Sequence, residues 1–301
     1  MNDNKEKIIT ETTADPTPKK KLRGYALVRV VMMWVFAVMF VVFATIWIFF
    51  LVRDHIANGV TDGVMSGFDN IIYDGTAPSD TDPIVFPGGS DSQSPESSED
   101  PKDDAYAQYI ASCIAEAKAM KEQYPDFRGI IVIEGDTINL RYPILQSTDN
   151  QYYVGHLIDG TANSTGEIFM DYRNGTDIMS NMNSVFYGHN MNNGTKFGQI
   201  KNYKYNNAFY THNITVITSE AVLTFKPFSF YKTDIYNPYN TTSFKNTEEF
   251  AAFCASEQER SMFKSSYSFT GQERIITLST CYGTSKTERY CLHAVLVNVS
   301  K

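Results

Sequence analysis

The sequence predicts a mainly β domain, either a closed barrel or a sandwich, attached to one membrane-spanning helix. Eight short segments are rich in β-branched and aromatic residues and are separated by clusters of Gly, Asn and Asp. Few helical patterns lie between them, which argues against alternating βαβ units. The eight segments are 129–133, 139–146, 167–172, 184–189, 213–218, 221–231, 274–280 and 289–299.

A long apolar segment near the N-terminus predicts the membrane-spanning helix. Residues 30–52 contain no charged side chain, and a helix of that length measures roughly 34 Å, enough to cross a hydrocarbon core of about 30 Å. Trp34 and Trp47 lie toward its two ends, where interfacial aromatics are found. The run is longer than the apolar core of a cleaved signal peptide, which favours an uncleaved anchor. Basic residues precede it, so we expect residues 1–29 in the cytoplasm and the chain from residue 53 onward outside the cell membrane.

A polar segment is expected to separate the anchor from the folded domain. Residues 53–103 are rich in Ser, Pro, Gly and Asp, with an acidic end, and this composition is typical of a flexible linker. The stretch GVMSGFDNIIYDG within it could form a short structured piece, and this alternative stays open. The extracellular domain is expected over residues 104–301. It should begin with an amphipathic helix that places Cys113 on its apolar face. A second helical pattern, residues 247–263, lies between the sixth and seventh strands.

Composition and motifs exclude several classes of function. The net charge of −8 and the pI near 5.2 argue against nucleic acid as a partner, because phosphate binding needs a basic face. The sequence has no CxxC or HExxH motif, so a zinc site is not expected. It also has no GxSxG elbow and no glycine-rich phosphate loop.

Cysteine and histidine remain as residues that could carry chemistry. Cys281 ends the seventh strand and enters a Gly-containing loop, and Arg289 opens the next strand, so hairpin geometry can bring the two together. His189 ends the fourth strand after Gly188, which permits a close backbone approach. A nearby cation favours the thiolate, and a guanidinium can stabilise an oxyanion with several donors.

Two other interpretations of Cys281 stay open on spacing alone. A single cysteine in a strand is more often a packing residue. An exported chain also permits disulfides, and Cys281 and Cys291 could face each other across the hairpin. Four cysteines in 301 residues are sparse for a disulfide framework, and the other two lie in helical patterns. Because Arg289, Cys291 and His293 share one face of their strand, Cys291 could also lie near the site without being a catalyst.

Two motifs give this chain a family resemblance. TLSTC at 277–281, followed by Arg289, and YGHNM at 187–191 together resemble the sortases, and class B in particular. A Cys–Arg pair alone would be a weak signal. The two motifs together with the helical pattern at 247–263, in the right order along the chain, make a specific one.

The resemblance extends beyond the motifs, over about residues 104–301. Segments 124–160 and 166–174 are similar to the class B strands and loops that lead to the active site. The helical pattern at 247–263 matches the additional helix that class B members carry between strands six and seven. The resemblance therefore implies an eight-stranded sortase-type β-barrel with an N-terminal helix and this extra helix.

This resemblance also implies a function. It implies a membrane-anchored cysteine transpeptidase that attaches secreted proteins to the envelope of a Gram-positive bacterium, with no metal or organic cofactor. Cys281 would be the nucleophile, His189 the general acid/base and Arg289 the transition-state stabiliser. Cys281 would attack the Thr carbonyl of a C-terminal sorting signal, NPQTN-like or PxTG-like. An amine of the peptidoglycan precursor or cross-bridge would then resolve the thioacyl-enzyme.

The same resemblance suggests where the sorting signal binds. Ser279 and Thr280 adjoin the thiol, and Tyr187 lies in the histidine motif, so these three are the predicted substrate-binding residues. The segment at about 226–273 is expected to read the signal. Two alternatives stay open: a cysteine endopeptidase that mainly hydrolyses, and a catalytically silent, wall-associated binding domain on the same barrel.

Overall fold

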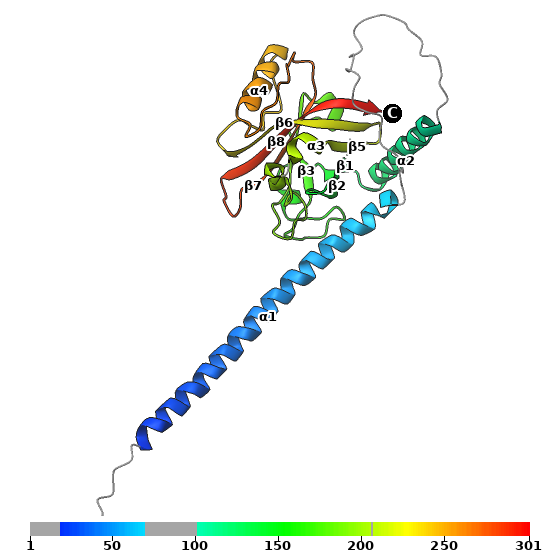
Figure 1. Ribbon diagram of the computed structural model, residues 1–301. Coiled ribbons are helices and arrows are strands. Elements are labelled where there is room, and N and C mark those ends of the chain that lie inside the picture. The colour runs from blue at the N-terminus through cyan, green and yellow to red at the C-terminus, as the bar shows by residue number, and fades with distance from the viewer. Residues whose placement is uncertain (1–18, 70–100, 206) are drawn as a thin grey trace, which may run out of the picture. The chain divides into compact units, whose positions relative to one another are not determined.

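The computed structural model describes residues 19–69, 101–205 and 207–301 (Figure 1). The chain divides into two compact units, Met1–Val52 and Arg53–Lys301. Residues 1–18 of the predicted cytoplasmic segment lie outside the described residues. Residues 70–100 of the predicted linker also lie outside them.

Helix α1 (Lys19–Asp69) contains the predicted anchor. Within the described residues it is the one helix long and apolar enough to cross a membrane, judged by length and composition over Leu27–Phe68. Trp34 and Trp47 are each 65% exposed, so neither packs into a protein core. These properties fit a membrane anchor, and its topology stays a prediction.

Residues 53–69, at the start of the predicted linker, continue helix α1 to Asp69. Ala57, Met65 and Phe68 are buried there, and the last two pack with Ile110 of helix α2 (Pro101–Gln123). Apolar residues at helical spacing form a stripe that can be buried. This helical stripe was not predicted from the sequence, because the linker as a whole has a polar composition.

All eight predicted strands form one closed barrel, which confirms the mainly β prediction and decides for a barrel over a sandwich. Their order around the barrel is β1-β2-β3-β4-β7-β8-β6-β5. The strands are β1 (Phe127–Ile133), β2 (Leu140–Leu145), β3 (Ile168–Met170), β4 (Asn183–Tyr187), β5 (Ile214–Ile217), β6 (Val222–Asp234), β7 (Ile275–Cys281) and β8 (Glu288–Ser300). The connections contain helix α3 (Ala208–Thr211) and the 3-10 helices η1 (Tyr152–Val154), η2 (Ile178–Ser180) and η3 (Ile200–Lys204).

Strands β7 and β8 are buried on both faces. Leu278 and Leu292 are a cross-strand pair in the largest buried cluster, which takes side chains from every strand of the barrel. Ile275 and Val295, another pair, belong instead to a cluster with Phe250 of helix α4 (Thr247–Glu259). A strand buried on both faces has a nearly continuous apolar sequence, which explains the uniform pattern of segment 274–280.

Helix α4 confirms the helix predicted between the sixth and seventh strands, although it ends four residues earlier than expected (Figure 1). Its start is capped by Asn246, whose side-chain oxygen accepts a hydrogen bond of 2.9 Å from the backbone N–H of Glu249. Cys254 is fully buried beside Phe250. Burial raises the pKa of the Cys254 thiol well above its ordinary value, so this cysteine is a packing residue.

Candidate active site

Three neighbouring strands bring the candidate reactive residues to one edge of the barrel. Cys281 is the last residue of β7 and is paired with Arg289 of the antiparallel strand β8. On its other side β7 pairs with β4 in parallel, with Tyr187 opposite Ser279. Since parallel strands end at the same edge, His189, which follows β4, lies at the edge where β7 ends.

Hydrogen bonds fasten the loop after β4 to the end of β7. The side-chain amide of Asn190 donates to the Cys281 carbonyl at 2.8 Å. The Gly188 carbonyl accepts from the hydroxyl of Thr280 at 2.8 Å, and its N–H donates to the Ser279 carbonyl at 3.3 Å. A Cβ at Gly188 would lie 2.8 Å from the ring of Phe197, so glycine permits this close approach.

One hydrogen bond sets the proton position on the half-buried imidazole of His189. Its Nε2 lies 2.9 Å from the Val154 carbonyl, which can only accept a hydrogen bond. Nε2 therefore carries a proton, and in the neutral ring Nδ1 is the free base. The backbone carbonyl of His189 accepts from Phe197 at 3.0 Å and holds the loop in place. This arrangement suits a general acid/base.

The guanidinium of Arg289 is fixed through one of its nitrogens. Nη1 donates to the carbonyls of Lys286 and Glu288 at 3.0 and 2.9 Å. Its Nε and Nη2 groups have no hydrogen-bond partner among the described residues. Donors that are held in position but remain unoccupied can bind an oxyanion that forms at the neighbouring Cys281.

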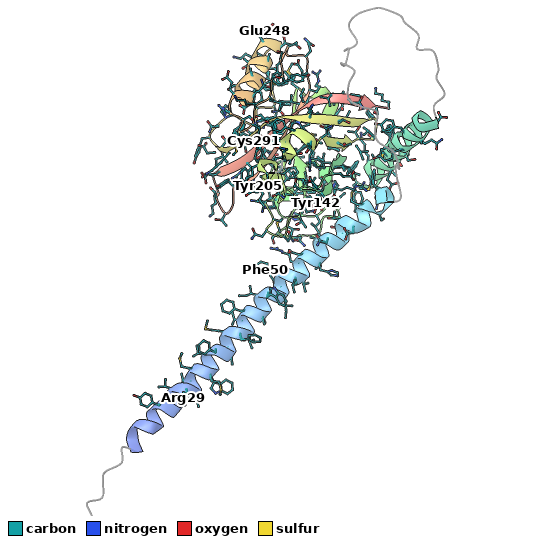
Figure 2. The ribbon with its side chains drawn as sticks, viewed as in Figure 1. Arg29, Phe50, Tyr142, Tyr205, Glu248 and Cys291 are labelled. Atoms are coloured by element: carbon teal, nitrogen blue, oxygen red, sulfur yellow. The ribbon has the colours of Figure 1, made fainter. Side chains whose placement is uncertain are left out.

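The register of the β7–β8 hairpin argues against a Cys281–Cys291 disulfide. Cys291 is paired with Ser279, not with Cys281, so the two cysteines are diagonal neighbours. Diagonal neighbours lie about 7–8 Å apart, beyond the usual disulfide Cα separation of about 4.4–6.8 Å. All four cysteines of the chain are in described residues, and all are free thiols. Cys291 lies within the barrel domain (Figure 2) and is fully buried, which raises the pKa of its thiol well above the ordinary value.

The three predicted substrate-binding residues lie in different surroundings. Ser279 is 2% exposed and hydrogen-bonds to Tyr239. Thr280 is equally buried and its hydroxyl is engaged with Gly188, so its position supports a structural tie and not contact with a peptide. Tyr187 is half-buried, and its hydroxyl donates to Asp171 at 2.9 Å.

Sequence reasoning missed Tyr239, which lies in the segment between β6 and α4. Its hydroxyl is 3.0 Å from the Ser279 hydroxyl, and it is 2% exposed. Burial raises the pKa of Tyr239 above its ordinary value, and the Ser279 hydrogen bond offsets part of this rise. Tyr239 also packs with Tyr231 and Cys291 in a small buried cluster. The sequence placed it only within the broad segment 226–273.

Tyr239→Phe is expected to lower the free energy of unfolding by about 1 kcal/mol, because the buried Ser279 hydroxyl loses its partner. Tyr236→Phe is the matched control, since Tyr236 belongs to the same segment and is 81% exposed. Denaturant titration of both variants checks this. Equal stability of the two variants would show that the Tyr239–Ser279 contact contributes nothing.

Asp171 is a buried carboxylate that binds the side chain of Tyr187 in strand β4. Its carboxylate is fully buried, accepts from Tyr187, and is bound twice by the Arg173 guanidinium, at 2.9 and 2.6 Å. Burial by itself raises the pKa of Asp171, but the hydrogen bonds from Arg173 and Tyr187 outweigh it and lower the pKa below the ordinary value. The folded state therefore favours the ionised carboxylate.

This shift predicts acid sensitivity. A carboxylate whose pKa is lowered on folding stabilises the protein above its unfolded pKa of about 3.9, and the contribution is lost as pH falls through the lower, folded value. Asp171→Asn is expected to reduce stability at neutral pH and to flatten the decline below about pH 4. Thermal unfolding of both proteins from neutral to acid pH tests this, and parallel declines would contradict it.

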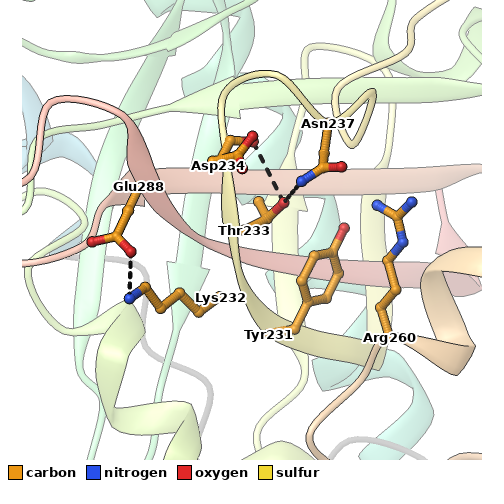
Figure 3. A pocket seen from close by; sticks show the side chains of 7 residues that line it. All are labelled: Tyr231, Lys232, Thr233, Asp234, Asn237, Arg260 and Glu288. Carbon is orange, nitrogen blue, oxygen red and sulfur yellow. Dashed lines mark hydrogen bonds and ion pairs between the residues drawn. The ribbon is translucent and has the colours of Figure 1, made fainter.

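A cavity of about 550 Å³ opens beside the site, on β6 and the segment that follows it (Figure 3). Thr233 in its wall is the β6 partner of Arg289. None of the three candidate reactive residues lines it. The lining residues are Tyr231, Lys232, Thr233, Asp234, Asn237, Arg260 and Glu288.

Comparison with known proteins identifies the family. A sortase domain model matches residues 133–297, more than half of the chain. With the closed barrel and the Cys–His–Arg edge described above, this match shows that the chain belongs to the sortase family.

The relatives place it in class B. The chain is 35% identical to Sortase B of Listeria monocytogenes over 143 residues, which cover 46% of this chain and 57% of that protein. It is 30% identical to Sortase B of Staphylococcus aureus over 178 residues, 58% of this chain and 72% of that protein. The X-ray structure of Clostridium perfringens sortase B matches 60% of this chain and 99% of its own, with 31% identity and a TM-score of 0.55. The resemblance to class B sortases is confirmed.

Proposed function

We propose that this class B sortase is a cysteine transpeptidase that acts on the C-terminal sorting signal of secreted proteins. One observation carries the proposal: Cys281 and Arg289 are paired at the edge of the barrel where β4 also ends and His189 follows. This edge of the barrel therefore carries a thiol, a base and a cation. Family membership supports the same activity.

The first half-reaction transfers the acyl group to the enzyme. Nδ1 of His189 takes the thiol proton of Cys281 as the sulfur attacks the Thr carbonyl of the signal. The Nε and Nη2 groups of Arg289 stabilise the tetrahedral oxyanion. His189 gives a proton to the leaving amine, and the C-terminal fragment departs. The product is a thioester between Cys281 and the threonine.

The second half-reaction regenerates the thiol. An acceptor amine attacks the thioester, His189 removes its surplus proton, and the new amide leaves as Cys281 recovers its hydrogen. The proposed acceptor is an amine of the peptidoglycan precursor or cross-bridge. The proposed signals are NPQTN-like or PxTG-like peptides.

The proposed setting is the cell membrane. Residues 30–52 act as a single-pass anchor, residues 1–29 are cytoplasmic, and the catalytic domain over 104–301 is extracellular. The composition and length of helix α1 support this arrangement. The connecting segment 53–103 begins with the helical turns that end at Asp69.

The function is tested with the full-length chain in detergent micelles. Fluorogenic NPQTN and PxTG peptides are incubated with and without triglycine as the amine, and products are separated by mass. We expect cleavage that accelerates with the amine and yields the ligated peptide. Cleavage that the amine does not change would instead indicate a hydrolytic endopeptidase, and absence of turnover would indicate a binding domain.

A further inference from the structure

A buried polar cluster links helix α4 to the barrel wall beside the candidate active site. Glu257 of α4 is 1% exposed; its carboxylate accepts a hydrogen bond from the Tyr231 hydroxyl of β6 and lies 3.3 Å from Nε2 of His293 in β8. Arg260 lies 3.5 Å from the other carboxylate oxygen. The Glu257 carbonyl also accepts from the hydroxyl of Ser229 at 2.5 Å.

Glu257 is ionised in spite of its burial. Burial raises the pKa of Glu257, but hydrogen bonds from His293 and Tyr231 and the charge of Arg260 lower it to below the ordinary value. Removing such a charge from water costs several kcal/mol, and apolar residues of equal volume often stabilise a fold better. A role in geometry explains the buried charge better than a role in stability.

His293 continues the connection across the neighbouring strands. Its Nδ1 lies 2.9 Å from the hydroxyl of Thr277, its partner in β7. Thr277 in turn donates its hydroxyl hydrogen to Oδ1 of Asn183 in β4 at 2.8 Å. All three side chains are fully buried. A hydrogen-bonded chain thus runs from α4 through β8 and β7 to β4.

The hydrogen-bonded series crosses strands β8, β7 and β4. Each of them leads to one candidate reactive residue at the same edge: Arg289 in β8, Cys281 in β7 and His189 after β4. We propose that Glu257 is a positioning residue for the sortase reaction: through His293, Thr277 and Asn183 it holds the strands in the arrangement that brings the reactive groups together. This inference rests on the proposed function.

Cys291 belongs to the same cluster. Its sulfur lies 3.1 Å from Nε2 of His293, on the strand face that Arg289 shares. Tyr231, the β6 partner of Cys291, and Arg260 both contact the Glu257 side chain and also line the cavity beside Arg289 (Figure 3). The cluster therefore reaches the wall of this cavity as well as the strands of the site.

The test compares four variants of the full-length chain in detergent micelles. Glu257→Gln removes the charge, and Glu259→Gln is its control, because Glu259 is exposed on the same helix. Thr277→Val removes the hydroxyl that joins His293 to Asn183 and leaves the side-chain volume nearly unchanged, whereas Thr277→Ser keeps the hydroxyl. We expect Glu257→Gln and Thr277→Val to lower kcat for peptide transfer about tenfold or more, with KM within about twofold, since small displacements of reacting groups are costly. The two controls should match the wild type.

Two further measurements separate positioning from folding. The Glu257→Gln/Thr277→Val double variant should be no slower than the slower single variant, because both act through one chain. Amide hydrogen exchange in 275–281 and 288–293 should be faster in both damaging variants than in their controls. Three results would each overturn the inference. The first is a double variant whose loss of kcat is the product of the two single losses. The others are a Glu257→Gln kcat equal to that of Glu259→Gln, and amide exchange that neither damaging variant changes. If the wild type transfers no peptide, the proposed function is wrong. The exchange measurement then still decides whether Glu257 holds the strands in their arrangement.

Discussion

Cys281→Ala is expected to abolish turnover of sorting peptides, with a loss of about 10⁴-fold or more. Without the sulfur no thioester can form, and neither His189 nor Arg289 can replace a nucleophile. The side chain is partly exposed at the end of β7, so alanine removes the thiol without opening a core cavity. The initial rate of peptide cleavage measures the loss, and thermal unfolding should show an unchanged fold.

Cys291→Ser is the matched control for the nucleophile. Serine keeps a hydrogen-bonding group beside His293 and is close in volume to cysteine, so we expect turnover within about tenfold of the wild type. Mass spectrometry of the enzyme with bound peptide should place the acyl group on Cys281. If Cys291→Ser were as inactive as Cys281→Ala, the assignment of the nucleophile would be wrong.

Arg289→Lys is expected to have the second largest effect, a loss of about 10²–10³-fold in kcat. Lysine keeps the positive charge but offers a single ammonium in place of the planar guanidinium. In the wild type Nη1 is held by two backbone carbonyls while Nε and Nη2 remain available within the described structure. A lysine cannot both occupy those carbonyls and present donors in this geometry to the oxyanion.

The kinetic pattern distinguishes the role of Arg289. Stabilisation of the transition state alone should lower kcat and leave KM nearly unchanged, whereas a role in holding the peptide should raise KM. Lys232→Arg, on the neighbouring strand β6, controls for the exchange of one basic side chain for another beside the cavity. If Arg289→Lys had the kcat of the wild type, the proposed oxyanion contact would be disproved.

Local patterns in the sequence predicted most of the fold. Alternating and apolar segments located all eight strands, and the hairpin between Cys281 and Arg289 followed from one short loop. The placement of His189 is different, because it depends on the parallel pairing of β4 with β7, which are far apart in the chain. In the sequence analysis only the family resemblance joined these residues.

Features set by tertiary packing were beyond the sequence. The hairpin register, which puts Cys291 opposite Ser279, depends on how the two strands pair and cannot be read from composition. Tyr239 lies in an irregular segment whose fold is determined by its burial against the barrel. Residues 53–69 are helical because a few apolar side chains find partners.

The parallel pairing of β4 and β7 brings together candidate reactive residues from distant parts of the polypeptide. A cut in the segment between β6 and α4 would leave His189 on one fragment, and Cys281 with Arg289 on the other. Neither fragment would hold a complete set of reactive groups: the first would lack strands β7 and β8, and the second would lack strands β1 to β6. The proposed transfer activity would thus report reassembly of the two pieces, so this chain could serve as a split reporter of proximity.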